Sequence, residues 1–231
     1  TETIESKRAR WARELSEETI ENIQAIEDRI ELEEAKSGYG NNHYEKETFI
    51  VAGSIPQLWV QVFFCSHIPN KEPDEICISS LKHAEEVARR QLAHWRSVKN
   101  YQMIAQSAMM IATIAQYRIE CRMIKEATTI DQSLEEALKL LEEAESLFGT
   151  TLYEVDLSHS LAALESKFHV GSKMRIWTVG KTAARLLFHA IQMIDASTEG
   201  SEDQGLQASH QDKVLKLWQW VQRVKARTLA Q

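Results

Sequence analysis

The thiols that could act as nucleophiles are few and widely separated in this sequence. Its three cysteines are Cys65, Cys77 and Cys121, and no two of them show the Cys-x-x-Cys spacing of a redox or zinc motif. Cys65 and Cys121 lie in apolar surroundings, where a buried structural thiol is far more common than a reactive one. An odd number of cysteines without such a motif is typical of a reducing compartment, so a cytoplasmic location is expected.

The histidines and carboxylates do not form a metal-site pattern. His83 and His94 are eleven residues apart on an expected helix, so they share a face but lie about 16 Å apart along its axis. Asp156 and His159 form one Asp-x-x-His pair, whereas a di-iron helical bundle needs two Glu-x-x-His motifs and further glutamates. The sequence therefore predicts no metal and no cofactor.

Motifs that define common enzyme classes are missing from the sequence. There is no His-Glu-x-x-His, no Walker loop, no Gly-x-Gly-x-x-Gly and no Gly-x-Ser-x-Gly. A non-catalytic chain is expected. Two alternatives stay open: an all-α enzyme with an apolar pocket near Trp95, Tyr117 and Trp177, and a structural domain that self-associates through its first helix.

Composition favours an all-α fold. The chain has 231 residues, of which 43% are apolar and 26% charged, with only three prolines and eight glycines. A net charge of −7 argues against a general nucleic-acid binder. No uninterrupted apolar run of 18 residues occurs, so no membrane-spanning helix is expected.

Hydrophobic periodicity divides the chain into three expected parts, 1–36, 37–73 and 74–231. The first is one long, charge-rich helix over 3–35. The second begins with a polar loop at 37–48 and continues with the apolar stretch Phe49–Ile68, which could form a strand or a helix. We favour a short helix, because Pro56 suits a first helical turn and no second strand-like run is available to pair.

The third part is expected to be a helical array. Its predicted helices lie at 74–98, 101–126, 131–148, 157–166, 173–195 and 211–229, with a mobile acidic loop at 196–210. Asp131 and Gly149 are expected to cap the third of these helices. The last helix carries an apolar stripe that should pack as one broad face, formed by Val214, Leu217, Trp218, Val221, Val224 and Thr228.

Two of these helices share a pattern of small and large residues. One contains Ala137, Leu141 and Ala144 and the other contains the same pattern 46 residues later, at Ala183, Leu187 and Ala190. This Ala-x3-Leu-x2-Ala spacing resembles the second helix of a tetratricopeptide (TPR) repeat, although the family's usual period is 34 residues. The resemblance implies antiparallel helical hairpins stacked as a TPR-like α-solenoid, a right-handed superhelix. A generic helical bundle is the alternative.

The end of the chain extends this resemblance. It resembles the segment in which TPR arrays of fungal-type proteins run into a CHAT domain, a caspase-like protease module, at Trp220, Gln222, Arg223, Lys225, Ala226, Arg227 and Leu229. With the repeats, this likeness covers about the last third of the chain. It implies a protein-binding or regulatory scaffold region that precedes a protease, whose catalytic His and Cys would then lie beyond Gln231.

The TPR resemblance also implies a binding groove lined by the first helix of each repeat. The basic residues that would fall there are Arg118, Arg122, Lys125, Lys167, Lys173 and Arg175. Cations in such a groove would bind an acidic peptide segment or a C-terminal carboxylate. The alternative is that they only solubilise the surface or pair with nearby glutamates, namely Glu135, Glu136, Glu142 and Glu143.

Overall fold

The protein is described by a computed structural model. The residues that it describes are 14, 17–29, 45–68, 71–97, 99–154, 177–193 and 204–229. Every regular element among them is a helix, so the predicted all-α class is confirmed for this part of the chain. None of its helices is apolar over a stretch long enough to cross a membrane.

The chain forms two compact units, Thr1–Gln91 and Leu92–Gln231. The boundary between them lies inside helix α3, Glu75–Ser97. From the sequence, boundaries were predicted after residues 36 and 73 instead. A polar loop and a pair of prolines mark those positions in the sequence, whereas a change of packing partners within one continuous helix leaves no such mark.

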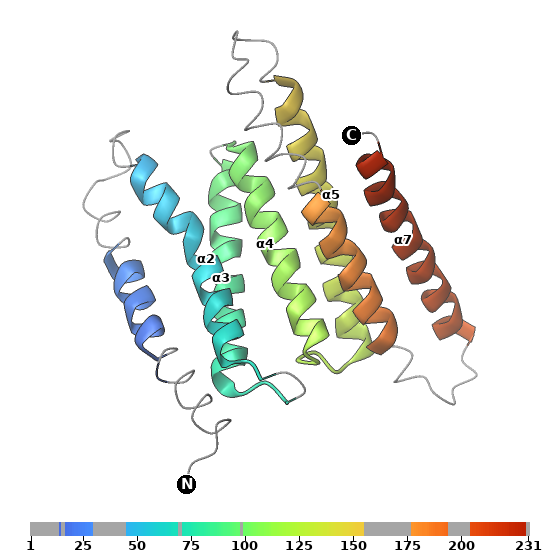
Figure 1. Cartoon of the computed structure of the whole chain (residues 1–231), viewed down its shortest axis with the longest axis horizontal. Helices are drawn as coiled ribbons and strands as arrows, with labels where there is room; N and C mark the ends of the chain where they lie inside the picture. Colours follow the sequence, from blue (N-terminus) through green and yellow to red (C-terminus); the bar gives the residue numbers. More distant parts are fainter. Residues whose placement is uncertain are drawn as a thin grey trace. The chain divides into compact units, whose positions relative to one another are not determined.

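The first unit contains a helix at 17–29, helix α2 at Glu45–Ser66 and most of α3 (Figure 1). The edge of the Trp59 ring meets His83 with centroids 4.6 Å apart, and His83 Nε2 lies 3.1 Å from both carboxylate oxygens of Glu27. One histidine therefore joins the three helices that the structure describes in this unit.

Helix α2 settles the ambiguity of the apolar stretch in favour of a helix, but a longer one than expected. It begins at Glu45, so the polar loop predicted for 37–48 is wrong over 45–48. Pro56 lies inside α2 and not in its first turn. Burial of Trp59, Val62 and Phe63 at helical spacing explains why the β-branched and aromatic residues here do not form a strand.

The second unit contains α4 at Tyr101–Glu120, α5 at Ala127–Glu154, a helix at 177–193 and α7 at Gln204–Leu229. Asn100 caps α4, since its side-chain oxygen accepts a hydrogen bond from the backbone N–H of Met103 at 3.2 Å. The same helix ends where Arg122 adopts a left-handed backbone with φ 56°.

Four predicted boundaries in this unit need correction. Helix α4 stops at Glu120 and not at 126. Helix α5 begins at Ala127 and runs on through Gly149, so both Asp131 and Gly149 lie inside it and neither is its cap. Residues 204–210 belong to α7, so the mobile loop predicted for 196–210 is wrong over that range. The predicted helix at 157–166 lies outside the described residues, as do the ends of the helices predicted for 3–35 and 173–195.

Small side chains allow the helices of the second unit to approach closely. The fully or almost fully buried alanines are Ala105, Ala108, Ala112, Ala137, Ala144, Ala183 and Ala190. Each occurs at helical spacing beside large buried residues such as Ile111, Leu141 and Leu187. This alternation of small and large residues packs the ridges of one helix into the grooves of the next.

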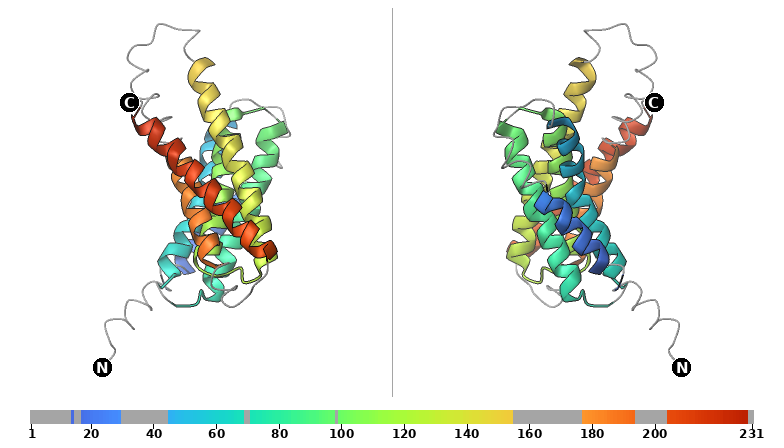
Figure 2. Two further views of the ribbon diagram at one scale, coloured as in Figure 1. Left: turned by 90° about the vertical axis from the view of Figure 1, so that its right-hand side faces the viewer. Right: turned by 90° about the vertical axis from the view of Figure 1, so that its left-hand side faces the viewer.

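Ion pairs show that α5 and α7 run in the same direction. Lys213 Nζ lies 3.0 Å from Asp131 Oδ1 near the start of both helices. Further along both, Arg223 Nη1 lies 3.7 Å from Glu145 Oε2. The helix at 177–193 runs antiparallel to α7, because Gly180 near its start meets Val224 near the end of α7 (Figure 2).

The helix at 177–193 also contacts α4, with Arg185 and His189 both at Glu120. Helix α5 also packs on α4, and 177–193 also meets α7 at Gly180. Both Ala-x3-Leu-x2-Ala helices thus pack against α4 and α7, and the 46-residue repeat stays a prediction.

Helix α7 does not bury the single apolar face that the sequence predicts. Trp220 and the side chain of Lys213 are buried, whereas Val214, Trp218 and Val221 are exposed. The ion pairs of Lys213 and Arg223, together with the close approach at Gly180, fix the rotation of α7. These two ion pairs and the close approach at Gly180 together set which side of this helix faces the unit.

Candidate functional site

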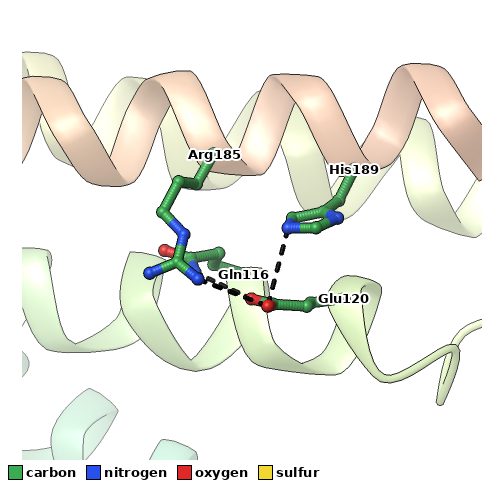
Figure 3. Close-up of polar contacts among 4 residues, drawn as sticks. All are labelled: Gln116, Glu120, Arg185 and His189. Carbon is green, nitrogen blue, oxygen red and sulfur yellow. Dashed lines mark hydrogen bonds and ion pairs between the residues drawn. The ribbon is translucent and has the colours of Figure 1, made fainter. Parts of the chain in front are cut away.

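A cluster of polar side chains joins the end of α4 to the helix at 177–193 (Figure 3). Gln116 Nε2 donates a hydrogen bond to Glu120 Oε2 at 3.0 Å. Arg185 Nη2 donates to Glu120 Oε1 at 3.3 Å, and His189 Nε2 lies 3.6 Å from the same oxygen. Glu120 therefore fixes the positions of two side chains on the neighbouring helix.

Burial in this region keeps two neighbouring groups protonated. Burial raises the pKa of Tyr117; Arg185 opposes this shift, while Glu120 and Cys121 add to it. Burial, with the negative charge of Glu120, raises the pKa of the Cys121 thiol to about 11. Only roughly one thiol in ten thousand is then ionised at pH 7, so Cys121 is not an activated nucleophile.

Cys121 is expected to alkylate slowly at neutral pH, because the thiolate is the reacting form. The alkylation rate of Cys121 should rise about tenfold for each unit of pH until the pH reaches about 11, the pKa of this thiol. Peptide-resolved mass spectrometry of iodoacetamide labelling measures this rate, with the exposed Cys65 as an internal reference. Labelling of Cys121 as fast as that of Cys65 at pH 7 would contradict the assignment.

The helix at 177–193 presents a row of exposed side chains on the face next to Glu120. We call these residues the 177–192 row: Trp177, Lys181, Arg185, Phe188 and Gln192. At 100° per residue they span an arc of roughly 80°. The row therefore forms one continuous strip along the helix.

Two aromatic rings and two cations make up most of this row. Trp177 is 44% exposed and Phe188 is 49% exposed. Lys181 Nζ lies 5.1 Å from the centre of the Trp177 ring, within the range of a cation–π contact. Exposed Trp, Phe and Arg are the residue types enriched at protein interfaces.

Arg185 is held in place within the row by Glu120. Its side chain remains 48% exposed while it pairs with that carboxylate, and a guanidinium has five N–H donors. A carboxylate of a bound segment could therefore accept hydrogen bonds from the other N–H groups of Arg185 while Arg185 stays paired with Glu120. The exposed donors of Arg185 can accept a further carboxylate as a hydrogen-bond partner.

The basic residues predicted from the repeat pattern are placed differently. Arg118 is half-buried near the end of α4, while Arg122 and Lys125 are exposed in the connection from α4 to α5. Placing Arg122 and Lys125 on a helix was wrong, because the chain leaves α4 at Glu120. The other three, Lys167, Lys173 and Arg175, lie outside the described residues.

The alternative role of those cations was pairing with four glutamates of α5, and two of these glutamates pair with other residues. Glu135 pairs with Lys139 of its own helix at 3.5 Å. Glu143 accepts a hydrogen bond from Arg96 Nη2 at 2.6 Å. These two glutamates thus have partners that the sequence reasoning did not name.

The 177–192 row was missed because the repeat template made this helix the second helix of a hairpin, whereas the binding groove was expected on the first helix. A usable signal was present: its cations, Lys181 and Arg185, are four residues apart and lie between Trp177 and Phe188. Cys65 was also misplaced, since it is exposed and not buried in its apolar run.

Within the described part of the chain, no group of three or more His, Cys, Asp or Glu side chains could hold a metal ion. No protein-family model matches the chain, and no significant match was found among curated proteins or solved structures. The site is therefore interpreted from its own geometry.

Proposed function

We propose that the second unit is a non-catalytic, protein-binding helical array that recognises an acidic peptide segment through the 177–192 row. The observation that carries this proposal is the exposed strip in which two cationic side chains, Lys181 and Arg185, lie between two aromatic ones, Trp177 and Phe188. Aromatic rings supply apolar contact area at small entropic cost, and the cations supply selectivity for negative charge.

We further propose that this array is a TPR-like α-solenoid. Three features support the proposal: parallel α5 and α7, an antiparallel pairing of 177–193 with α7, and contact between 177–193 and α4. Stacked helical hairpins have these relations between alternate helices. The row would then lie on a helix that belongs to the same side of the array as α4.

A fluorescence-anisotropy screen tests the proposed recognition. The probes are labelled decapeptides with free C-terminal carboxylates, ranging from net acidic to net basic. We expect acidic peptides that carry an aromatic or leucine residue to bind best, and binding to weaken as salt is added. Lys181→Glu and Trp177→Ala should each weaken the best binder by about tenfold, or about 1.4 kcal/mol.

Lys139→Glu is the matched control for the charge reversal. Lys139 is 72% exposed on α5, where it pairs with Glu135, so its reversal makes the same change in net charge at a position outside the row. The affinity of the Lys139→Glu variant for the best-binding peptide should stay within about twofold of that of wild type. Equal losses for Lys139→Glu and Lys181→Glu, or no preference for acidic peptides, would contradict the proposal.

A second proposal concerns the setting in which the array acts. The likeness of Trp220, Arg223 and the residues after them to the segment before a CHAT domain supports a regulatory arm attached to a caspase-like protease. In α7 the Arg223 guanidinium lies 4.8 Å from the centre of the buried Trp220 ring. The coding sequence of the natural protein tests this proposal: a downstream His followed by a Cys in an α/β pattern would support it, and any other downstream sequence would contradict it.

A further inference from the structure

His189 lies beside the 177–192 row without belonging to it. Its Nε2 lies 3.6 Å from Oε1 of Glu120, the same oxygen that accepts a hydrogen bond from Arg185 of the row at 3.3 Å. Figure 3 shows that the histidine and the arginine approach this carboxylate together from one helix. The His189 side chain is 23% exposed, so its imidazole can exchange protons with solvent.

Histidine is the side chain whose charge normally changes near neutral pH. An imidazole is mostly neutral at about pH 8 and mostly protonated at about pH 5. In the neutral ring Nε2 donates a hydrogen bond in only one of two tautomers, whereas both nitrogens of the protonated ring donate. Protonation of His189 therefore turns its contact with Glu120 into an ion pair.

The other groups of α4 near His189 do not change charge over this pH range. Burial raises the pKa of Tyr117, and burial with the charge of Glu120 raises the pKa of Cys121 to about 11, so both groups stay neutral. Arg118 lies roughly 160° round the helix from Glu120 and therefore on its opposite side. Glu120 is thus the charged group that α4 directs at this histidine.

The charges of α7 at the level of His189 are paired. Helix α7 runs antiparallel to 177–193, and the contact of Gly180 with Val224 puts the residues of α7 near 215 level with position 189. The two cations of α7 at this level each pair with an aspartate, Lys213 with Asp131 at 3.0 Å and Lys216 with Asp212 at 2.7 Å.

The protonation of His189 changes how the cluster attracts an acidic segment. With His189 neutral, the opposite charges of Glu120 and Arg185 balance. With His189 protonated, the three side chains carry one net positive charge, and Glu120 repels an incoming carboxylate less effectively. A carboxylate at the exposed donors of Arg185 is then attracted more strongly.

We propose that His189 is a pH sensor for the 177–192 row, which binds an acidic segment more tightly when this histidine is protonated. The proposal rests on the peptide recognition proposed for the row. By linkage, binding of the segment should in turn favour the uptake of a proton by His189. The cluster is partly exposed, so the gain in affinity should lie at the low end of typical couplings, about fivefold.

Fluorescence anisotropy with the full chain and the best-binding acidic decapeptide tests this proposal. Measurements are made at about pH 8 and about pH 5.5 with a pH-insensitive label, because the carboxylates of the peptide are ionised at both values. Wild type should bind about fivefold more tightly at the lower pH. His189→Gln keeps a neutral donor near Glu120 and should lose this gain. His94→Gln removes an ionisable ring of the same unit outside the cluster and should keep it.

The outcomes separate the pH sensor from peptide recognition itself. Acidic peptides that bind wild type equally at both pH values, or an equal gain in wild type and His189→Gln, would overturn the sensor and leave peptide recognition intact. No binding of acidic peptides at either pH would remove both proposals.

A measurement on wild type keeps the test decisive if His189→Gln does not fold. Isothermal titration calorimetry at about pH 6.5, in two buffers with different ionisation enthalpies, counts the protons taken up when the peptide binds. The proposal predicts proton uptake. Binding without a change in bound protons would overturn it.

Discussion

Replacing Gly180 by alanine is expected to loosen the attachment of α7, although alanine is the better helix former. A glycine inside a helix costs about 1 kcal/mol relative to alanine. The stability that alanine would add through its higher helix propensity is smaller here than the cost of a steric overlap, because a Cβ on Gly180 would overlap Cγ2 of Val224. Overpacking at such a contact typically costs about 1–3 kcal/mol. Amide hydrogen exchange over 204–229 measures the result and should be faster in Gly180→Ala.

The double variant Gly180→Ala, Val224→Ala is the control for this explanation. Shortening Val224 removes the group that the new Cβ meets, so slow exchange in α7 should return. Val224→Ala alone should cost only about 1 kcal/mol, since it removes two methyl groups from a half-buried site. A Gly180→Ala variant that protects α7 better than wild type would show that helix propensity, and not close packing, governs this position.

Replacing Asp131 by asparagine is the second change with a large expected effect. The side chain of Lys213 is only 8% exposed, and its ammonium lies 3.0 Å from the carboxylate of Asp131. The side chain of Asp131 is 45% exposed, but its carboxylate is a partner of the buried Lys213 ammonium, whose charge would be less well compensated without it. We expect a loss of about 1–3 kcal/mol in the free energy of unfolding of the second unit.

Lys213→Met in the Asp131→Asn background should recover most of that loss. Methionine keeps a long apolar side chain without the charge. Urea titrations followed by far-ultraviolet circular dichroism measure all three variants against wild type. If the double variant is less stable than Asp131→Asn alone, Lys213 does not depend on Asp131 and the explanation fails.

The sequence predicted the helices well and their contacts poorly. Strong periodicity located α3 within one residue at each end, and the apolar stretch around Trp59 was correctly favoured as a helix. Gly149 was misread, because a glycine near the end of a periodic segment usually marks a cap, whereas α5 continues to Glu154. Local signals of this kind do not include the tertiary packing that extends a helix.

The face of α7 shows most clearly what could not be predicted. Val214, Leu217, Trp218, Val221 and Val224 form a good apolar stripe in the sequence. Only contacts with other helices, at Asp131, Glu145 and Gly180, determine that this stripe is rotated partly out of the unit. Such long-range contacts have no signature within a single helix.

The same limit applies to the candidate site. Lys181 and Arg185 were visible as cations, but their position on an exposed row depends on the contact of Arg185 with Glu120, 65 residues earlier in the chain. The predicted cations Arg122 and Lys125 were chosen by counting along a repeat template. That template continued the helix past the point at which the left-handed backbone of Arg122 ends it.

The indole N–H signals of the six tryptophans give the most direct test of the central claim, that the 177–192 row binds an acidic segment. A two-dimensional ¹⁵N–¹H spectrum is recorded while the best acidic decapeptide is added, and Trp177→Phe assigns the signal of Trp177. The account predicts that the Trp177 signal moves in proportion to saturation, while the signals of the buried Trp59 and Trp95 stay in place. Saturation of the protein with an unmoved Trp177 signal would contradict it.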